Sequence, residues 1–118
     1  MPANMSTNQD LKQWDIVKVH VQPNDRDEHP AIILSPTEAL SAFARVCVFY
    51  GTTKRPAKNI EPGQILLNGS DGLDHLTVFD TLQIYMVSKT SITQKISEVS
   101  HVRRAALKRL IISTYRLL

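Results

Sequence analysis

Hydrophobic and polar residues alternate along residues 15–21 (DIVKVHV), near the start of the chain. Four aliphatic residues carry most of the apolar positions, and Lys18 and His20 lie between them. This period of two is typical of a strand that is buried on one face. A second apolar run, residues 30–34 (PAIIL), is unbroken and rich in β-branched residues, which predicts a central strand buried on both faces. The polar, charged residues between the two runs predict a loop.

The middle of the chain predicts further short strands separated by turn-forming residues. We expect these strands at residues 44–51, 64–67, 73–79 and 81–87. Prolines and a glycine predict a loop at 55–63, and Asn and Gly residues predict a turn at 68–72. Residues 37–43 predict a short helical turn or crossover with Thr37 as its cap. Short strands with such turns are typical of a small, closed or partly closed antiparallel barrel.

The hydrophobic period changes near the C-terminus. From Ser97 or Ser100 onward, apolar residues recur three and four positions apart, at Val102, Ala105, Ala106, Leu110 and Ile112. This spacing predicts one amphipathic helix with Ser100 as candidate cap. The last residues, 110–118, are apolar around more than one face and either pack deeply or form a dimer interface. The predicted fold class is therefore mainly β: an SH3-like antiparallel barrel of five to seven strands followed by a C-terminal α-helix.

Length and composition place this fold in one ordinary domain. A chain of 118 residues with 42% hydrophobic and 21% charged residues is sufficient for a single modest core. Residues 1–10 are polar and aperiodic, so we expect a flexible arm followed by one domain over residues 11–118. No apolar run approaches the ~18 residues of a membrane span, and no signal-peptide pattern is present. We therefore expect a cytoplasmic protein without a membrane partner.

The cysteine content and the net charge indicate which kinds of site and partner to expect. Cys47 is the only cysteine and lies in an apolar run, so we expect a small buried side chain in a reducing compartment. No zinc-type Cys/His spacing occurs, and we expect neither a metal nor a cofactor. The net charge is +3, and much of the excess lies in the last stretch, at Arg103, Arg104, Lys108, Arg109 and Arg116. These residues either attract a polyanion or form a solvated helix face.

Three short motifs resemble the MazF/PemK family of type II toxin endoribonucleases. Residues 29–36 (HPAIILSP) match an Arg-Pro-Ala-hydrophobic-Leu-Ser-Pro strand at all positions except His29, where the family has its catalytic arginine. Residues 48–53 (VFYGTT) match a strand that ends in Thr-Thr, with Tyr50 in place of a proline. Residues 78–81 (VFDT) match a strand that ends in Asp-Gln. The resemblance spans roughly residues 14–112 and implies the same barrel with a C-terminal helix.

The resemblance also implies an activity and partners. Such enzymes cleave single-stranded RNA without a metal ion: the 2′-hydroxyl attacks the adjacent phosphate and leaves a 2′,3′-cyclic phosphate. The family implies a homodimer with a groove at its interface, and a cognate antitoxin whose extended tail occupies that groove. The reaction requires a base, an acid and donors for the negative phosphorane.

The matching positions provide the candidate site residues. The candidate catalytic residues are His29, Thr52, Thr53 and Asp80, and the candidate RNA-binding residues are Arg26, Glu28, Lys54 and Arg55. Histidine lacks the planar fork of arginine but titrates near neutrality, so His29 is either an acid or base or a neutral loop residue. A threonine hydroxyl either donates to the phosphate or forms part of a turn, and Asp80 either takes part in the reaction or caps a turn. Arg26 is a candidate replacement for the missing guanidinium.

Two departures keep a second interpretation open. His29 and Val78 both stand where family members carry arginines. The loop between Pro23 and Pro30 is also shorter than the family's usual loop and has no glycine. The chain is therefore predicted to be either an endoribonuclease of the toxin family or a degenerate barrel that binds RNA or a protein partner without cleaving. A barrel unrelated to toxins, with short motifs that converged, is the third alternative.

Overall fold

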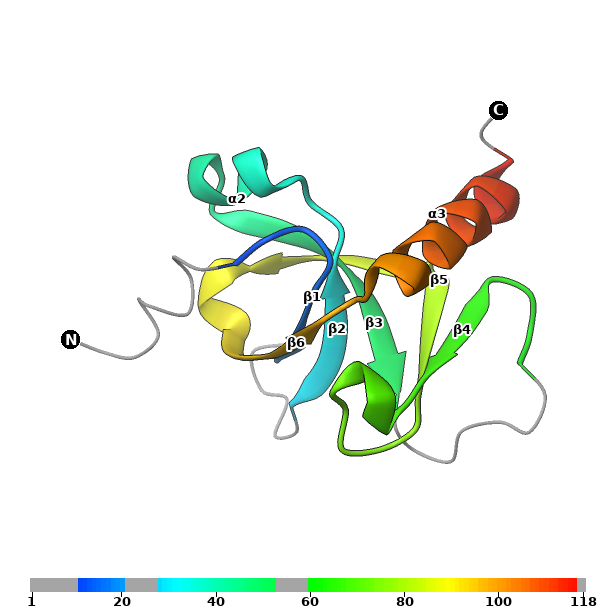
Figure 1. Ribbon diagram of the computed structural model, residues 1–118. Coiled ribbons are helices and arrows are strands. Elements are labelled where there is room, and N and C mark those ends of the chain that lie inside the picture. The colour runs from blue at the N-terminus through cyan, green and yellow to red at the C-terminus, as the bar shows by residue number, and fades with distance from the viewer. Residues whose placement is uncertain (1–10, 21–27, 53–59, 117–118) are drawn as a thin grey trace.

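A six-stranded antiparallel sheet forms the centre of the computed structural model, which describes residues 11–20, 28–52 and 60–116 (Figure 1). The strand order is β4-β5-β3-β2-β1-β6. The strands are β1 (Asp15–Val19), β2 (His29–Ile33), β3 (Arg45–Thr52), β4 (Gln64–Leu67), β5 (Thr77–Ser88) and β6 (Ile92–Glu98). The helices are α2 (Thr37–Ala42) and α3 (His101–Tyr115), with short 3₁₀ turns η1 (Gly69–Asp71) and η2 (Lys89–Ser91). The mainly β class with a C-terminal helix is confirmed, and six strands lie within the predicted five to seven.

Strand β2 occupies the position that its apolar run predicts. It pairs with β1 on one side, where Ile16 lies opposite Ile32, and with β3 on the other, where Ile32 lies opposite Phe49. Residues 30–33 are all buried, which confirms a central strand covered on both faces. Strand β1 ends at Val19; Val21, which we predicted to extend it, lies outside the described residues.

Strand β5 differs from the prediction. We expected strands at 73–79 and 81–87, but residues 73–76 form a loop and Thr77–Ser88 is one continuous strand. The register with β3 shifts at a large bulge, since Gly51 of β3 pairs with Phe79 whereas Phe49 pairs with Ile84. The polar residues at this bulge are typical of a turn between two strands, which is why we expected two. Pairing with β3 nevertheless continues on both sides of the bulge.

Strand β6 was not predicted. Its sequence, ITQKISE, has few apolar residues because it is an edge strand that pairs only with β1 and exposes one face to solvent. Periodicity in such a short, polar segment is too weak to distinguish a strand from a loop.

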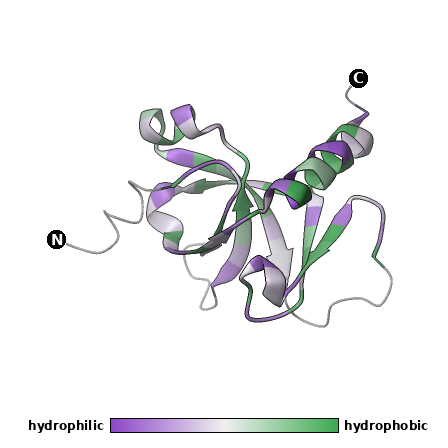
Figure 2. Cartoon of the chain, viewed as in Figure 1, coloured by the Kyte–Doolittle hydropathy of each residue, from purple (hydrophilic) through white to green (hydrophobic). Residues whose placement is uncertain are grey.

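Two hydrophobic cores cover the two faces of β1, β2 and β3. The first core consists of aliphatic residues, and its members are Leu11, Val17, Val19, Ala31, Ile33, Leu40, Val46, Val48, Val87 and Ile92. The second contains the large aromatic residues and lies under α3; its members are Trp14, Ile16, Ile32, Phe49, Leu67, Leu73, Phe79, Val99 and Leu107. Figure 2 shows hydrophobic residues along the central strands and a mixture of both classes along α3.

Asp71 links the two edges of the sheet. Its carboxylate accepts hydrogen bonds from the Asn68 N–H (2.9 Å) and from Arg103 Nε and Nη2 (3.1 and 3.2 Å). Its carbonyl accepts one from Ser97 Oγ at 2.7 Å. Gly72 follows with a φ of +88°, and a Cβ there would lie 2.5 Å from Ser97 Oγ, so only glycine fits. The turn after β4 is thereby joined to β6 and α3.

Trp14 holds the start of β1 against the second core. The residue adopts a left-handed backbone with φ 77°, which is unfavourable for a tryptophan. Its N–H donates to the Ile33 carbonyl at 2.8 Å, and its carbonyl accepts from the Val99 N–H at 2.9 Å. Its side chain is 8% exposed. These contacts connect β2 with the segment that leads into α3 and offset the backbone strain.

Helix α3 begins where the sequence predicts but buries a different face. Ser100 Oγ accepts from the Arg103 N–H at 3.2 Å, which confirms the cap. Leu107 is buried and Leu110 and Ile111 are partly buried, whereas Val102 is 78% exposed. The prediction that Val102 and Ile112 belong to the buried face was therefore wrong, because the docking angle of α3 on the sheet selects the row through 107, 110 and 111.

Two smaller predictions also need correction. Thr37 does not cap α2: Pro36 is the N-cap residue, and the Thr37 hydroxyl instead accepts from the Gln13 N–H at 3.1 Å. Cys47 is half-buried rather than buried, and desolvation by that burial raises the pKa of its thiol. Within the part of the chain that the structure describes, no helix is long and apolar enough to span a membrane.

Candidate functional site

His29 and Thr52 lie at the same end of two paired strands. His29 is the first residue of β2 and Thr52 is the last residue of β3. Ala31 pairs with Tyr50, and His29 and Thr52 each lie two residues beyond this pair, His29 before Ala31 and Thr52 after Tyr50. The paired strands therefore carry an imidazole and a hydroxyl, two of the candidate catalytic groups, at the same end of the sheet.

A row of aromatic rings extends from His29 across the sheet. The ring centroids of His29 and Tyr50 lie 4.9 Å apart at a tilt of 49°, and those of Tyr50 and Tyr85 lie 5.3 Å apart at 71°. These distances are typical of favourable aromatic pairs. Tyr85 is 39% exposed, and His29 and Tyr50 are partly exposed. We call these three residues the aromatic row; it offers flat, partly exposed rings beside the candidate catalytic histidine.

Glu28 lies next to His29 but faces a different group. Its Oε2 is 3.9 Å from His20 Nε2, a contact that becomes an ion pair when the imidazole is protonated. Alternation along β2 directs the side chains at 28 and 30 to the face opposite that of His29. Glu28 and Pro30 accordingly line a separate pocket, together with Lys18 and residues of the 73–77 segment.

Asp80 has structural contacts. Its Oδ1 accepts from the Leu82 N–H at 2.9 Å, and its Oδ2 lies 3.4 Å from Gln64 Nε2. Next to it, the Thr81 hydroxyl donates to the Gly63 carbonyl at 2.7 Å, and Tyr115 Oη donates to the Thr81 carbonyl. The carboxylate therefore serves the bulge in β5 and its junction with β4, which matches the alternative that it caps a turn.

Val78 stands where the resemblance places a second arginine, and its side chain is only 5% exposed. It pairs with Thr52 on one side and with Leu66 on the other. A buried aliphatic side chain cannot contact a phosphate, so position 78 contributes packing alone.

The remaining candidates cannot be placed. Arg26, Thr53, Lys54 and Arg55 lie outside the described residues. Of the basic residues on the helix, Arg103 and Arg104 form ion pairs with Asp71 and Glu98, at 3.1 and 3.3 Å. Part of the basic C-terminal stretch therefore stabilises the fold, while Lys108 and Arg109 are exposed.

Tyr85 and Arg45 were not among the sequence-based candidates. Arg45 begins β3, at the end opposite Thr52, and lines a shallow depression of about 700 Å³ together with His20. Its Nη2 donates to the Met86 carbonyl at 3.2 Å. Tyr85 is 35 positions from Tyr50 in sequence. Only the strand register, which the sequence alone does not provide, brings Tyr85 into the row beside His29, whereas Arg45 lies at the other end of β3.

Metal-binding geometry is absent from the described part of the chain: no group of three or more His, Cys, Asp or Glu side chains there could hold an ion. The chemical groups at the described strand ends are an imidazole, a threonine hydroxyl and phenol rings. Such groups can transfer a proton, donate hydrogen bonds and stack on planar rings.

Comparisons with known proteins agree with the observed fold. Residues 12–114 match the family model for PemK-like, MazF-like toxins of type II toxin–antitoxin systems. The fold is similar to the Mycobacterium tuberculosis toxin MazF-mt6, with a TM-score of 0.74 and 15% identity over 88% of this chain and 98% of that chain. It is also similar to a mycobacterial endoribonuclease in complex with its cognate antitoxin, with a TM-score of 0.75 and 16% identity over 92% and 97% of the two chains.

A third similar structure is MazE-MazF from Deinococcus radiodurans, with a TM-score of 0.69 and 13% identity over 92% of this chain and 98% of that one. No curated protein sequence is similar enough to count as a match. At these identities the structural likeness establishes the fold, and the family model establishes the family.

Proposed function

Because the chain belongs to the PemK-like, MazF-like toxin family of type II toxin–antitoxin systems, we propose that it is an endoribonuclease that cleaves single-stranded RNA without a metal ion. The observation that supports this most is that His29, whose ring lies against Tyr50, begins β2 at the end of the sheet where the neighbouring strand β3 ends in Thr52. A proton-transfer group and a hydroxyl donor at neighbouring strand ends are the kinds of group that such a reaction requires.

The proposed reaction is an internal transesterification. The 2′-oxygen of one ribose attacks the adjacent phosphorus and loses its proton, while the bond from phosphorus to the 5′-oxygen of the next nucleotide breaks. That 5′-oxygen gains a proton, and the products are a 2′,3′-cyclic phosphate and a 5′-hydroxyl. Atoms and charge balance without a water molecule or a cofactor.

His29 takes one of the two proton transfers, either from the 2′-hydroxyl or to the leaving 5′-oxygen. The hydroxyl of Thr52 donates to a non-bridging phosphate oxygen and stabilises the negative charge of the phosphorane. Thr53 is a second hydroxyl of the same kind, and Arg26, Lys54 and Arg55 provide cationic contacts to neighbouring phosphates. Asp80 acts at a distance by holding the bulge of β5, and Glu28 contacts the RNA from the pocket side of β2.

Cleavage of a long single-stranded RNA by the purified protein in EDTA tests this proposal. Fragments should carry 5′-hydroxyl and 2′,3′-cyclic phosphate ends, and His29→Ala should lower the rate by about 100-fold or more, as expected for loss of an acid or base. His101→Ala is the matched control, since His101 is an exposed histidine at the start of α3. An equal rate for His29→Ala and wild type would exclude His29 from the reaction.

One observation favours a second candidate function, a non-catalytic RNA-binding barrel. Val78 is buried and Asp80 is committed to backbone and Gln64 contacts, so neither position supplies the charged group that the family resemblance implies. If the wild-type protein folds, as judged by circular dichroism, and binds RNA but leaves it intact in the same assay, this second function is correct.

The partners follow from the family and from one exposed surface. Exposed apolar side chains continue from β5 to the end of α3, at Leu82, Ile84, Met86, Ile112 and Tyr115. We infer that two copies bury this surface in a homodimer and that a cognate antitoxin blocks the RNA site, in the cytoplasm. Sedimentation of Met86→Asp should show monomers where the wild type shows dimers, and co-expression with the antitoxin should abolish cleavage.

A further inference from the structure

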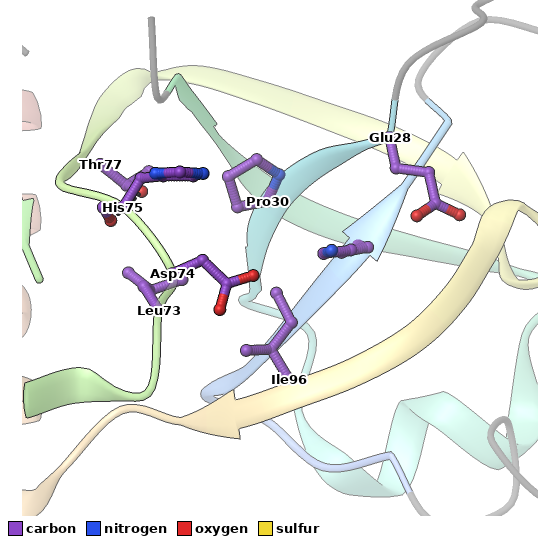
Figure 3. A pocket seen from close by; sticks show the side chains of 8 residues that line it. Glu28, Pro30, Leu73, Asp74, His75, Thr77 and Ile96 are labelled. Atoms are coloured by element: carbon purple, nitrogen blue, oxygen red, sulfur yellow. Dashed lines mark hydrogen bonds between the residues drawn. The ribbon is translucent and has the colours of Figure 1, made fainter. Parts of the chain in front are cut away.

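A small pocket lies behind the strand end that carries His29. It has a volume of about 150 Å³ and is lined by Lys18 of β1, Glu28 and Pro30 beside β2, Ile96 of β6, and Leu73, Asp74, His75 and Thr77 from the segment that leads into β5. Lys18 pairs directly with Pro30. Figure 3 shows the Asp74 side chain directed from its loop into the space between Pro30 and Ile96.

The pocket has an apolar floor and a polar rim. Pro30, Leu73 and Ile96 supply carbon surface, while Lys18 supplies an ammonium group and Asp74 and Glu28 supply carboxylates. Within the described residues, the side chains of Lys18 and Asp74 form no hydrogen bond or ion pair with one another or with a third group. Their hydrogen-bonding capacity is therefore available to a ligand.

This combination fits a flat ring with polar edges. A cavity of about 150 Å³ is the size that holds a single six-membered ring such as benzene. It is smaller than typical pockets for drug-sized ligands, and its size favours the single ring of a pyrimidine over the double ring of a purine. In single-stranded RNA, unstacked bases are read by hydrogen bonds to their edges.

The charges of the rim distinguish between the two pyrimidines. The exocyclic amino group of cytosine carries two N–H donors, which match the two carboxylates of Asp74 and Glu28, whereas uracil presents a carbonyl at that position and offers only its single N3–H as a donor. The ammonium of Lys18 can donate to the ring nitrogen or to the carbonyl oxygen of the same cytosine.

We propose that this pocket binds a cytosine base of the RNA, with Asp74 accepting from the exocyclic amino group and Lys18 donating to the opposite edge. The proposal rests on the proposed function for its substrate class. The pocket adjoins the reactive end of the sheet, because Glu28 and Pro30 flank His29, and Thr77 precedes Val78, the partner of Thr52. A strand of RNA that crosses the ends of β2 and β3 can therefore insert one base here.

Binding of 2′-fluoro oligonucleotides, which lack the attacking hydroxyl, tests the pocket separately from cleavage. Fluorescence anisotropy should show that wild-type protein binds oligo(C) about tenfold more tightly than oligo(U), within the range of one directed base contact. Asp74→Asn should make the two affinities nearly equal, because an amide can donate to the uracil carbonyl. Lys18→Met should weaken oligo(C) binding.

Matched variants control for charge. Glu61→Gln removes an exposed carboxylate before β4, and Lys108→Met removes an exposed lysine on α3; both should retain the preference for cytosine.

No preference in the wild type, or a preference that Asp74→Asn leaves unchanged, would overturn the proposal. If Asp74→Asn instead weakens binding only of an oligoarginine peptide, the pocket takes a basic side chain and the cytosine assignment is wrong. Loss of cleavage with an intact preference would contradict the proposed function alone.

Discussion

Two parts of the 68–76 connection between β4 and β5 use their polar groups in opposite ways. Where this connection meets the start of α3, Asp71 has hydrogen bonds to Asn68, to Arg103 and, through its carbonyl, to Ser97. Where it borders the pocket behind His29, the side chains of Asp74 and Lys18 have no partner among the described residues, and the rings of the aromatic row near His29 are partly exposed. Polar groups that are satisfied internally stabilise a fold, whereas exposed and unsatisfied ones are available to a ligand.

Two carboxylates three positions apart test this comparison most strongly. Asp71→Ala should lower the free energy of unfolding by about 3 kcal/mol, because it leaves Arg103 without its partner and removes the acceptor for the Asn68 N–H. Asp74→Asn should change it by less than about 0.5 kcal/mol, since Asp74 is exposed. Urea unfolding of both variants gives the two values, and equal effects would refute the contrast between the two parts of this connection.

Gly51 lies directly before Thr52 near the end of β3, and its replacement should have the next largest effect. A Cβ at this position would lie 2.6 Å from Cε1 of Phe79, within the second core. Gly51→Ala should therefore cost about 2 kcal/mol through overpacking. Gly69→Ala is the control, because a Cβ there meets nothing within 4 Å. Thermal unfolding of both variants checks the difference.

Tyr85 should matter for RNA more than for stability. Tyr85→Leu retains apolar bulk but removes a ring that can stack on a base, and should weaken RNA binding by about fivefold. Its free energy of unfolding should change by about 1 kcal/mol or less, because the ring is 39% exposed. Phe43→Leu, at an exposed residue after α2, should leave RNA binding unchanged. Equal binding by wild type and Tyr85→Leu would exclude the aromatic row as a stacking surface.

Cys47 should give the smallest effect. Burial raises the pKa of its thiol above the ordinary 9.0, so less thiolate is present at pH 8 than in the unfolded chain. Reaction with a disulfide reagent should be slower in the native protein than in urea. Because the folded pKa is the higher one, stability should fall only as pH rises above the ordinary value. A native thiol that reacts as fast as the unfolded one would contradict this.

The sequence was most informative where side chains alternate regularly or repeat a local signal. The buried run at 30–33 and the cap at Ser100 both follow from local chemistry and are confirmed. The errors lie in β5, in β6 and in the buried face of α3. In each case the outcome depends on which partner the segment meets, and a local pattern contains no such information.

The candidate site also combines features that the local sequence predicts with contacts that depend on distant segments. His29 and Thr52 could be named from short motifs, because each is defined by its neighbours in sequence. The contact of His29 with Tyr50, the extension of that row to Tyr85 and the pocket between β1, β2 and the 73–77 segment depend on strand register. The sequence by itself determined the fold class, the family and the residue types at the reactive end. Tertiary structure alone decided which of them meet, because register and the bulge in β5 arise from packing between segments far apart in the chain.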